Sequence, residues 1–98
     1  MNKGLPDGLV AYKRTPVFDE KTIPAGLMRG HSTKAGVWGT IHVLHGELLY
    51  RVIEPPGELI VNRDSPLVVI WPQEVHEVAL RGPVLFYVEF HAAKVETP

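Results

Sequence analysis

The sequence predicts an all-β protein that folds as one domain, and two observations lead to this fold class. Nine prolines and nine glycines are spread over 98 residues, and they interrupt most windows that are long enough for a helix. Between them lie short runs in which apolar and polar residues alternate, as they do in half-buried strands. Because apolar residues make up 45% of the chain, residues 1–98 are sufficient for a single packed sandwich or barrel.

Each expected strand is bounded by a turn signal. The first strand ends at Thr15-Pro16, and a break at Pro24 precedes the second. His45-Gly46 separates two strands in the middle of the chain, and Arg81-Gly82-Pro83 separates the last two. The remaining breaks are also marked by proline or glycine. The expected strands, in chain order, are 9–14, 26–31, 37–44, 48–53, 58–62, 67–71, 75–80 and 84–91.

Alternation within these strands predicts which side chains face the core. In 75–80, His76 shares a face with the apolar Val78 and Leu80, so we expect His76 to point inward with them. In 84–91, apolar residues occupy both faces. The sequence therefore leaves open whether Glu89, which interrupts this apolar strand, faces inward or outward.

Composition and charge exclude several classes of function. The formal net charge is −1, which gives nucleic acid no electrostatic reason to bind. The chain has no cysteine, so disulfides, thiolate metal sites and cysteine nucleophiles are excluded. No apolar run approaches the roughly 18 residues of a membrane span. We therefore expect a cytoplasmic protein without a membrane segment, and the small size of the barrel predicts a homodimer.

Several motifs point to a known family. His-Ser-Thr-Lys-Ala-Gly-Val-Trp-Gly at 31–39 is followed by Val-Leu-His-Gly at 43–46. Trp-Pro-Gln at 71–73 precedes His-Glu-Val at 76–78, and the chain opens with Val-Ala-Tyr-Lys-Arg-Thr-Pro-Val-Phe at 10–18. In these motifs it resembles the small cupin-like domain that occurs alone, or at the front of some tellurite-resistance B proteins. The resemblance implies a cupin-type β-barrel, a double-stranded β-helix or jelly roll, over nearly the whole chain.

The resemblance also implies a site, because cupin-type barrels hold a metal ion or a small ligand in the mouth. The usual cupin pattern of His-x-His, Glu and a later His falls on Ser32, Lys34, Gly39 and His76 in this sequence. His31 lies one residue out of register with that pattern. The methyltransferase domain of the longer proteins has no counterpart here, so methyl transfer is not carried over.

His31, His76 and Glu89 are the candidate metal ligands. Neutral imidazoles and a carboxylate suit one divalent transition metal (Zn, Fe or Ni) and leave coordination positions open. His91 is the alternative third member, and Lys34 and His91 are candidates for binding a small molecule or an anion. For each residue the alternative is a structural role: a histidine at the edge of the core, a solvated lysine, or a carboxylate on the wet face of the sheet.

Three functions remain open at this point. The first is a small cupin-like protein that binds a metal ion, a small ligand or an oxyanion in the barrel mouth, linked by the resemblance to tellurite or oxyanion tolerance. The second is a metal-dependent oxygenase or isomerase. The third is a structural dimerisation module without a ligand. The sequence leaves undecided whether the chain is an enzyme, and no arrangement of serine, histidine and aspartate points to a nucleophile.

Overall fold

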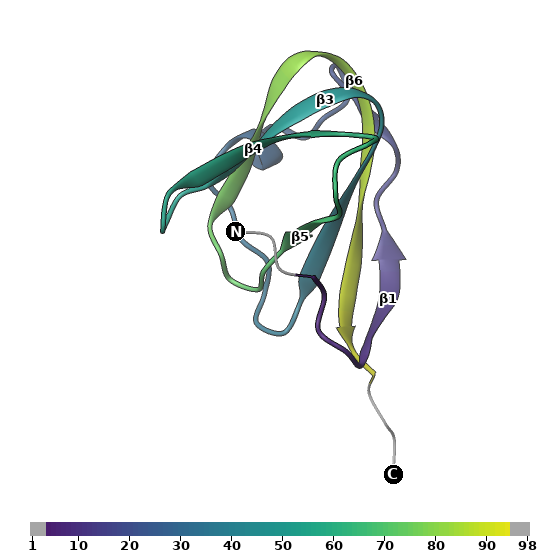
Figure 1. Cartoon of the computed structure of the whole chain (residues 1–98), viewed down its shortest axis with the longest axis vertical. Coiled ribbons are helices and arrows are strands. Elements are labelled where there is room, and N and C mark those ends of the chain that lie inside the picture. Colours follow the sequence, from purple (N-terminus) through teal and green to yellow (C-terminus); the bar gives the residue numbers. More distant parts are fainter. Residues whose placement is uncertain (1–3, 95–98) are drawn as a thin grey trace.

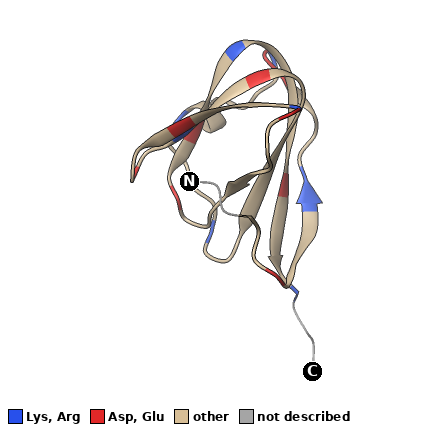
Figure 2. Ribbon diagram, viewed as in Figure 1, with Lys and Arg blue, Asp and Glu red and all other residues tan. Residues whose placement is uncertain are grey.

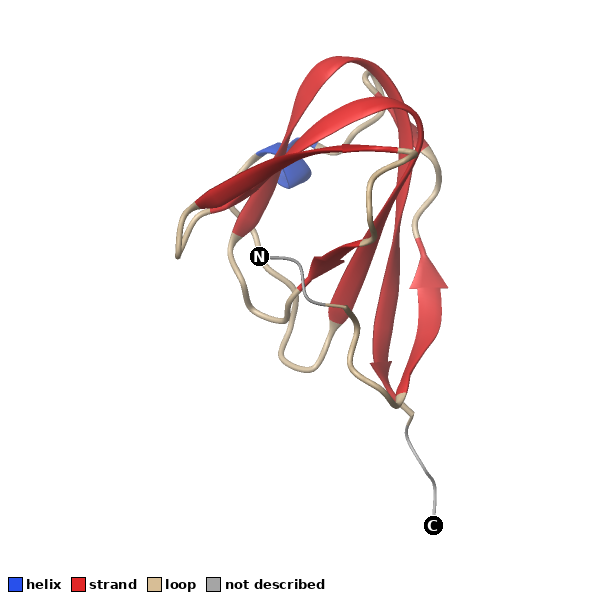
Figure 3. Ribbon diagram, in the orientation of Figure 1, coloured by secondary structure: helices blue, strands red, loops and turns tan. Residues whose placement is uncertain are grey.

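The structure is a computed structural model, and it describes residues 4–94; the two ends of the predicted domain, 1–3 and 95–98, lie outside the described residues. Strands and loops make up nearly all of it, with one short helical turn (Figure 3). The all-β prediction is confirmed. The elements are β1 (Leu9–Arg14), β2 (Phe18–Asp19), η1 (Ala25–Met28), β3 (Trp38–Val52), β4 (Gly57–Asn62), β5 (Val68–Ile70) and β6 (His76–Ala93).

The strands form one antiparallel sheet with the order β1-β6-β3-β4, while β2 pairs with β6 and β5 pairs with β3. Within the described residues this order does not return from β4 to β1. The sheet is therefore strongly curved but open, where a closed barrel was expected (Figure 1). Edge strands remain at β1 and β4, since each of them has a neighbour on one side in this order.

A long two-stranded ribbon of β3 and β6 forms the centre of the sheet. The two strands pair from Trp38 with His91 at one end to Val52 with His76 at the other, with register shifts near the middle. Gly46 lies at this bend with φ of 74°, and a Cβ there would lie 2.1 Å from the carbonyl oxygen of Pro83. Glycine is therefore required for the close approach of the two strands.

This bend corrects two of the expected turns. His45-Gly46 and Arg81-Gly82-Pro83 do not end strands. His45 and Gly46 pair with Leu85 and Val84, residues 81–83 fall in the register shift that follows, and pairing resumes at Leu48 with Leu80. Glycine with positive φ is typical of both turns and bulges, so the sequence signal alone does not separate the two. The four expected strands in these regions are two long strands, each bent once.

The expected strand 26–31 is also wrong. Pro24 precedes a 3₁₀-helix, η1, in place of the strand. Proline fixes φ at the value that the first residues of a helix need, which favours a helical turn after Pro24. His31 keeps an isolated bridge to His76, so a single residue of the expected strand pairs with β6.

The core lies on the concave side of the ribbon. His76 and Val78 are buried, as alternation in 75–80 predicted, but Leu80 on the same face is 36% exposed, because it lies next to the register shift at the bend. On β6 the buried residues Phe86 and Val88 resolve the parity that the sequence left open, because they turn Glu89 to the other face. The buried hydrophobic residues are Ile23, Ile41, Val43, Leu48, Tyr50, Val52, Val61, Val68, Val69, Ile70, Val78, Val84, Phe86 and Val88.

Charged residues of both signs are distributed over the strands and loops (Figure 2). No helix within residues 4–94 has the length and apolarity needed to cross a membrane.

Candidate functional site

The candidate site is a pocket of about 400 Å³ on the concave side of the sheet. The segment 31–37 supplies His31 and Lys34 to its polar lining, and the first residue of β6 supplies His76; residues 12, 13 and 15 line the pocket as well. Its apolar walls include Leu27 from η1, Ile70 from β5, and Val88 and Phe90 from β6. The pocket thus joins residues of both sequence motifs to one hydrophobic cavity, the usual form of a small-ligand site.

His31 and His76 are held together by their own backbones. The amide of His31 donates to the carbonyl of His76 at 3.0 Å, and the amide of His76 donates to that of His31 at 2.8 Å. The two imidazole rings meet edge to face with centroids 4.2 Å apart. The pairing is therefore fixed by main-chain geometry, and side-chain rotation alone does not separate the two residues.

Each ring is oriented by a second hydrogen bond. Nδ1 of His76 lies 2.7 Å from the carbonyl oxygen of Glu74, and Nδ1 of His31 lies 3.1 Å from that of Arg29. A carbonyl oxygen accepts hydrogen bonds and does not donate them, so both Nδ1 atoms carry a proton. In the neutral form of each ring, Nε2 consequently has a lone pair and no proton. Within the described residues, no hydrogen bond involves either Nε2.

Burial keeps the His76 ring neutral. The side chain of His76 is 1% exposed, and this desolvation lowers the pKa of His76 below its ordinary value. The hydrogen bond to Glu74 opposes the shift, and the neighbouring His31 adds to it. At neutral pH, His76, which lines the pocket, therefore has an acceptor at Nε2 and no positive charge.

The turn before β6 sets the position of the Glu74 carbonyl. Gln73 has φ of 62°, a left-handed conformation that is uncommon for a residue with a side chain. Its amide donates to the carbonyl of Thr33 at 3.1 Å, which ties the turn to the segment that carries His31. Backbone strain of this kind costs about 1–3 kcal/mol and often occurs where a site must be held rigid.

Two lysines give the pocket its charge. Lys34 lies on an exposed part of the rim, and Lys13 from β1 also lines the cavity. The lining includes no aspartate or glutamate from the described part of the chain. The sequence did not single out Lys13, an exposed residue next to a register shift between Ala11 and Lys13 that has no sequence signal.

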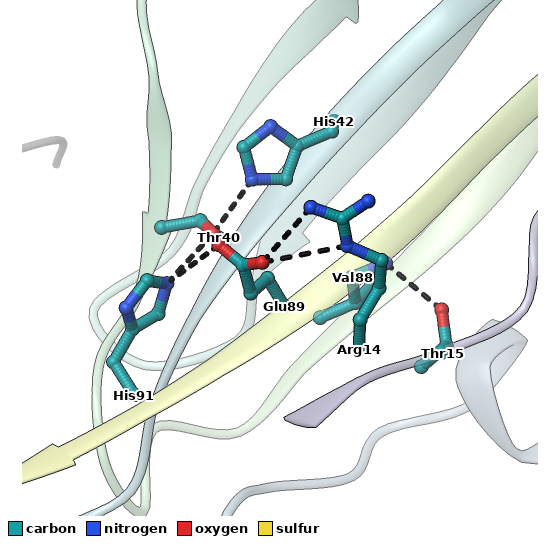
Figure 4. A network of polar contacts seen from close by, with 7 residues as sticks. All are labelled: Arg14, Thr15, Thr40, His42, Val88, Glu89 and His91. Carbon is teal, nitrogen blue, oxygen red and sulfur yellow. Dashed lines mark hydrogen bonds and ion pairs between the residues drawn. The ribbon is translucent and has the colours of Figure 1, made fainter. Parts of the chain in front are cut away.

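The structure does not bring Glu89 and His91 to this pocket. Both lie on the opposite face of the ribbon, in a network around the hydroxyl of Thr40 (Figure 4). Nε2 of His42 lies 2.8 Å from this hydroxyl and Nε2 of His91 lies 3.1 Å from it. Glu89 accepts from Arg14 at 3.1 Å, and its other oxygen is 3.7 Å from Nε2 of His91.

Aromatic contacts complete this network. The ring of His42 stacks on Tyr87 with centroids 4.7 Å apart, and the guanidinium of Arg14 lies 4.4 Å from the centre of the same ring. Burial lowers the pKa of His42, although the charge of Glu89 opposes the shift. His42 lies on the outer face, opposite the inward Ile41 and Val43. Its polar partners, together with those of His91, make this a structural network.

The pocket offers a metal ion two histidines. Among residues 4–94, no group of three or more histidine, aspartate or glutamate side chains is arranged to hold a metal. Zinc sites in proteins use three or four protein ligands, and Lys34 adds a positive charge to the rim. The residues present therefore do not fit a dedicated metal centre.

Tyr50 is a further polar residue next to the site. Its ring centroid lies 5.7 Å from that of His76, and its hydroxyl is the one buried side-chain polar atom in the described residues that lacks a hydrogen-bond partner. Burial raises the pKa of Tyr50, which keeps the phenol protonated. Alternation in 48–53 is enough to place Tyr50 inside, but no sequence pattern links it to His76.

A comparison with protein families now identifies the group. The family model of the TehB-like domain matches this chain over residues 13–88. The chain belongs to the TehB-like domain family. The matched segment includes every residue of the histidine pair and its anchoring carbonyls, and it ends at Val88, inside β6.

The curated relatives differ in length from this TehB-like chain. It is 31% identical over 74 residues to a protein of Haemophilus influenzae that is named as a probable S-adenosyl-L-methionine-dependent methyltransferase, TehB; the match covers 71% of this chain and 26% of that protein. The chain thus corresponds to about a quarter of that relative. It is 24% identical over 98 residues to the uncharacterized protein YeaR of Escherichia coli K12, covering 91% of this chain and 82% of YeaR.

Two solved structures share the fold of this TehB-like domain. The crystal structure of TehB from Haemophilus influenzae superposes with a TM-score of 0.80 at 29% identity, covering 89% of this chain and 32% of that one. A crystal structure of a protein from Escherichia coli K12 gives a TM-score of 0.85 at 21% identity, covering 96% of this chain and all of that one. The second likeness supports the fold alone.

Proposed function

We propose that this TehB-like domain binds a small anion in the pocket beside the His31–His76 pair. One observation carries the proposal: the cavity combines Lys34 and Lys13 with two oriented imidazoles, and its lining contains no acidic residue. A small ligand is favoured because the pocket has a volume of about 400 Å³ and apolar walls.

The charges act at short range. The lysines are exposed, but the apolar walls lower the effective dielectric constant inside the pocket, which strengthens the attraction between a lysine at its edge and an anion held within it. Exposed lysines alone are weak anion sites, because water and salt screen them. The buried His76 supplies what an exposed lysine lacks, namely a fixed polar contact at the inner end of the pocket.

An oxyanion such as tellurite is the ligand class that we propose. The family resemblance of the sequence motifs to tellurite-resistance proteins supports this class, and so does the match to TehB. The Haemophilus influenzae relative is named as a probable methyltransferase, but this chain spans only about a quarter of that protein. The proposed role is therefore ligand capture, with no reaction assigned.

A second candidate is a weak site for Zn, Fe or Ni between His31 and His76. The observation that favours it is the pair of carbonyls on the Nδ1 atoms, since metal-binding histidines usually donate their other ring N–H to such a partner. Exogenous ligands, an anion held by Lys34 among them, would complete the coordination. The small number of protein ligands makes this candidate secondary.

Calorimetric titration of the full chain with tellurite and with inorganic phosphate tests the proposal. Lys34→Ala is expected to weaken anion binding about tenfold, the effect of losing one charge-assisted contact. Lys21→Ala, which removes an exposed lysine outside the pocket lining, serves as the charge-matched control and is expected to bind normally. Failure of both anions to bind at millimolar concentration contradicts the proposal.

A parallel titration with Zn²⁺ and Ni²⁺ separates the two candidates. Stoichiometric metal binding that is lost in His76→Ala supports the metal site. Anion binding that needs no added metal, and that persists in the presence of a chelator, supports the anion pocket.

A further inference from the structure

We infer that the pocket selects oxyanions that still carry a proton, so that the ligand brings both a negative oxygen and an O–H group. The inference rests on the proposed anion binding and adds the determinant of specificity, which is Nε2 of His76. A lysine at the rim attracts the charge, and an acceptor at the inner wall requires a donor from the ligand.

The acceptor is fixed by the hydrogen bond on the other side of the ring. Nδ1 of His76 is 2.7 Å from the carbonyl oxygen of Glu74, and this contact needs the proton to be on Nδ1. The neutral ring has one N–H, so Nε2 then has a lone pair. A ring flip would exchange Nδ1 for a carbon and leave the buried carbonyl without its donor, which is unfavourable.

The surroundings keep the second proton away. His76 is buried, and the imidazole of His31 lies 4.2 Å away between ring centroids. The lysines Lys13 and Lys34 line the same cavity, and no carboxylate from the described residues faces it. Desolvation of the buried ring disfavours an imidazolium ion at this position, and the neighbouring His31 adds to this effect.

The consequence for a ligand follows from donor and acceptor matching. An anion with a hydroxyl can direct O⁻ toward Lys34 and donate its O–H to Nε2 of His76. A fully ionised anion of the same shape has oxygen lone pairs on every side, so one oxygen must face the lone pair of Nε2. A buried polar atom that meets a mismatched partner is disfavoured strongly enough to set specificity.

Hydrogen phosphate and sulfate are a matched pair of probes. Both are tetrahedral dianions at about pH 8, and they differ by the one proton that hydrogen phosphate retains. Calorimetry on the full chain at this pH is expected to show phosphate binding at least about tenfold more tightly than sulfate. Because the comparison uses the native chain, it does not depend on any variant folding.

Two variants assign the preference to one atom. In His76→Gln the side-chain amide can donate as well as accept, so the ratio of phosphate to sulfate affinity is expected to fall toward one. His45→Gln, at an exposed histidine of the ribbon bend outside the pocket lining, is the matched control and is expected to keep the native ratio.

The outcomes separate this inference from the proposed function. Equal affinity for phosphate and sulfate, or a preference for sulfate, overturns the inference and leaves the anion pocket standing. Binding of neither probe, nor of tellurite, overturns the proposed function. If His76→Gln does not fold, methyl phosphate decides on the native chain: this dianion has no O–H at about pH 8, so binding as tight as that of phosphate overturns the inference.

Discussion

Two histidine pairs lie on opposite faces of the same β3–β6 ribbon, and they differ in how completely their hydrogen bonds are made. On the outer face, Nε2 of His42 and Nε2 of His91 both contact the hydroxyl of Thr40. On the concave face, the Nε2 atoms of His31 and His76 have no such partner within the described residues, although both Nδ1 atoms do. Proximity of histidines therefore does not identify a site. Incomplete hydrogen bonding beside a cavity is the stronger reason to consider the inner pair a candidate site.

Replacing Thr40 gives the largest effect that the comparison predicts. Thr40→Val keeps the shape but removes the hydroxyl that both outer imidazoles contact. We expect a loss of about 2 kcal/mol in the free energy of unfolding, because buried ring nitrogens lose their partner. Urea titration measures this loss.

The Thr40 variant also sharpens the contrast when it is paired with Lys34→Ala. Thr40→Val is expected to lower stability while phosphate affinity stays at the native value. Lys34→Ala is expected to weaken phosphate binding while the stability stays at the native value, because Lys34 is exposed at the rim of the pocket. If Thr40→Val weakens phosphate binding as much as Lys34→Ala does, the two faces are coupled and the comparison fails.

Stability is expected to decline as the pH falls below about 6.5. Burial lowers the pKa of both His42 and His76 in the folded protein, so the unfolded chain binds more protons in this range. The stability from their neutral forms is present above the ordinary histidine pKa of 6.5 and is lost on acidification. Each group adds a slope of at most about 1.4 kcal/mol per pH unit.

Single variants show which face dominates the pH dependence. His76→Gln is expected to reduce the pH dependence of the urea midpoint between about pH 5 and 7 more than His42→Gln does, because His76 is more deeply buried. Glu89 also opposes the shift at His42. If the pH dependence changes more in His42→Gln, the outer face, and not the concave face, dominates it.

The smallest effect is expected at Tyr50. Its hydroxyl is buried without a partner, so Tyr50→Phe is expected to leave stability unchanged or to raise it by up to about 1 kcal/mol. Thermal unfolding compares it with Tyr12→Phe, at a residue that is 56% exposed. A loss of stability confined to Tyr50→Phe indicates that a bound water satisfies the hydroxyl.

The sequence predicted most strand positions and the inward face of 75–80, because alternation is a local property. It did not separate a turn from a bulge at Gly46, since that outcome depends on the approach of Pro83 from a distant strand. It also gave a strand at 26–31, where Pro24 starts a 3₁₀-helix. Each of these differences comes from a neighbour that the local pattern does not contain.

For the site, the sequence motifs selected His31, Lys34 and His76, and the structure places all three in one pocket. Glu89 and His91 were grouped with them, but the register that pairs Thr40 with Glu89 puts both on the other face. Apolar residues at both parities of 84–91 made that register undetectable before the strands were paired. The choice of a third partner therefore needed tertiary structure.

The bent ribbon also has a consequence for the order in which the chain folds. At one end of the ribbon, Val52 pairs with His76, and the loop of chain between them is short. At the other end, Trp38 pairs with His91, and the loop between them contains all the residues from 39 to 90. Closing the shorter loop costs less chain entropy, so register between β3 and β6 is expected to start beside His76 and to spread past Gly46. The strand end that contributes His76 to the candidate pocket is then also the one whose pairing sets the register for the rest of the sheet.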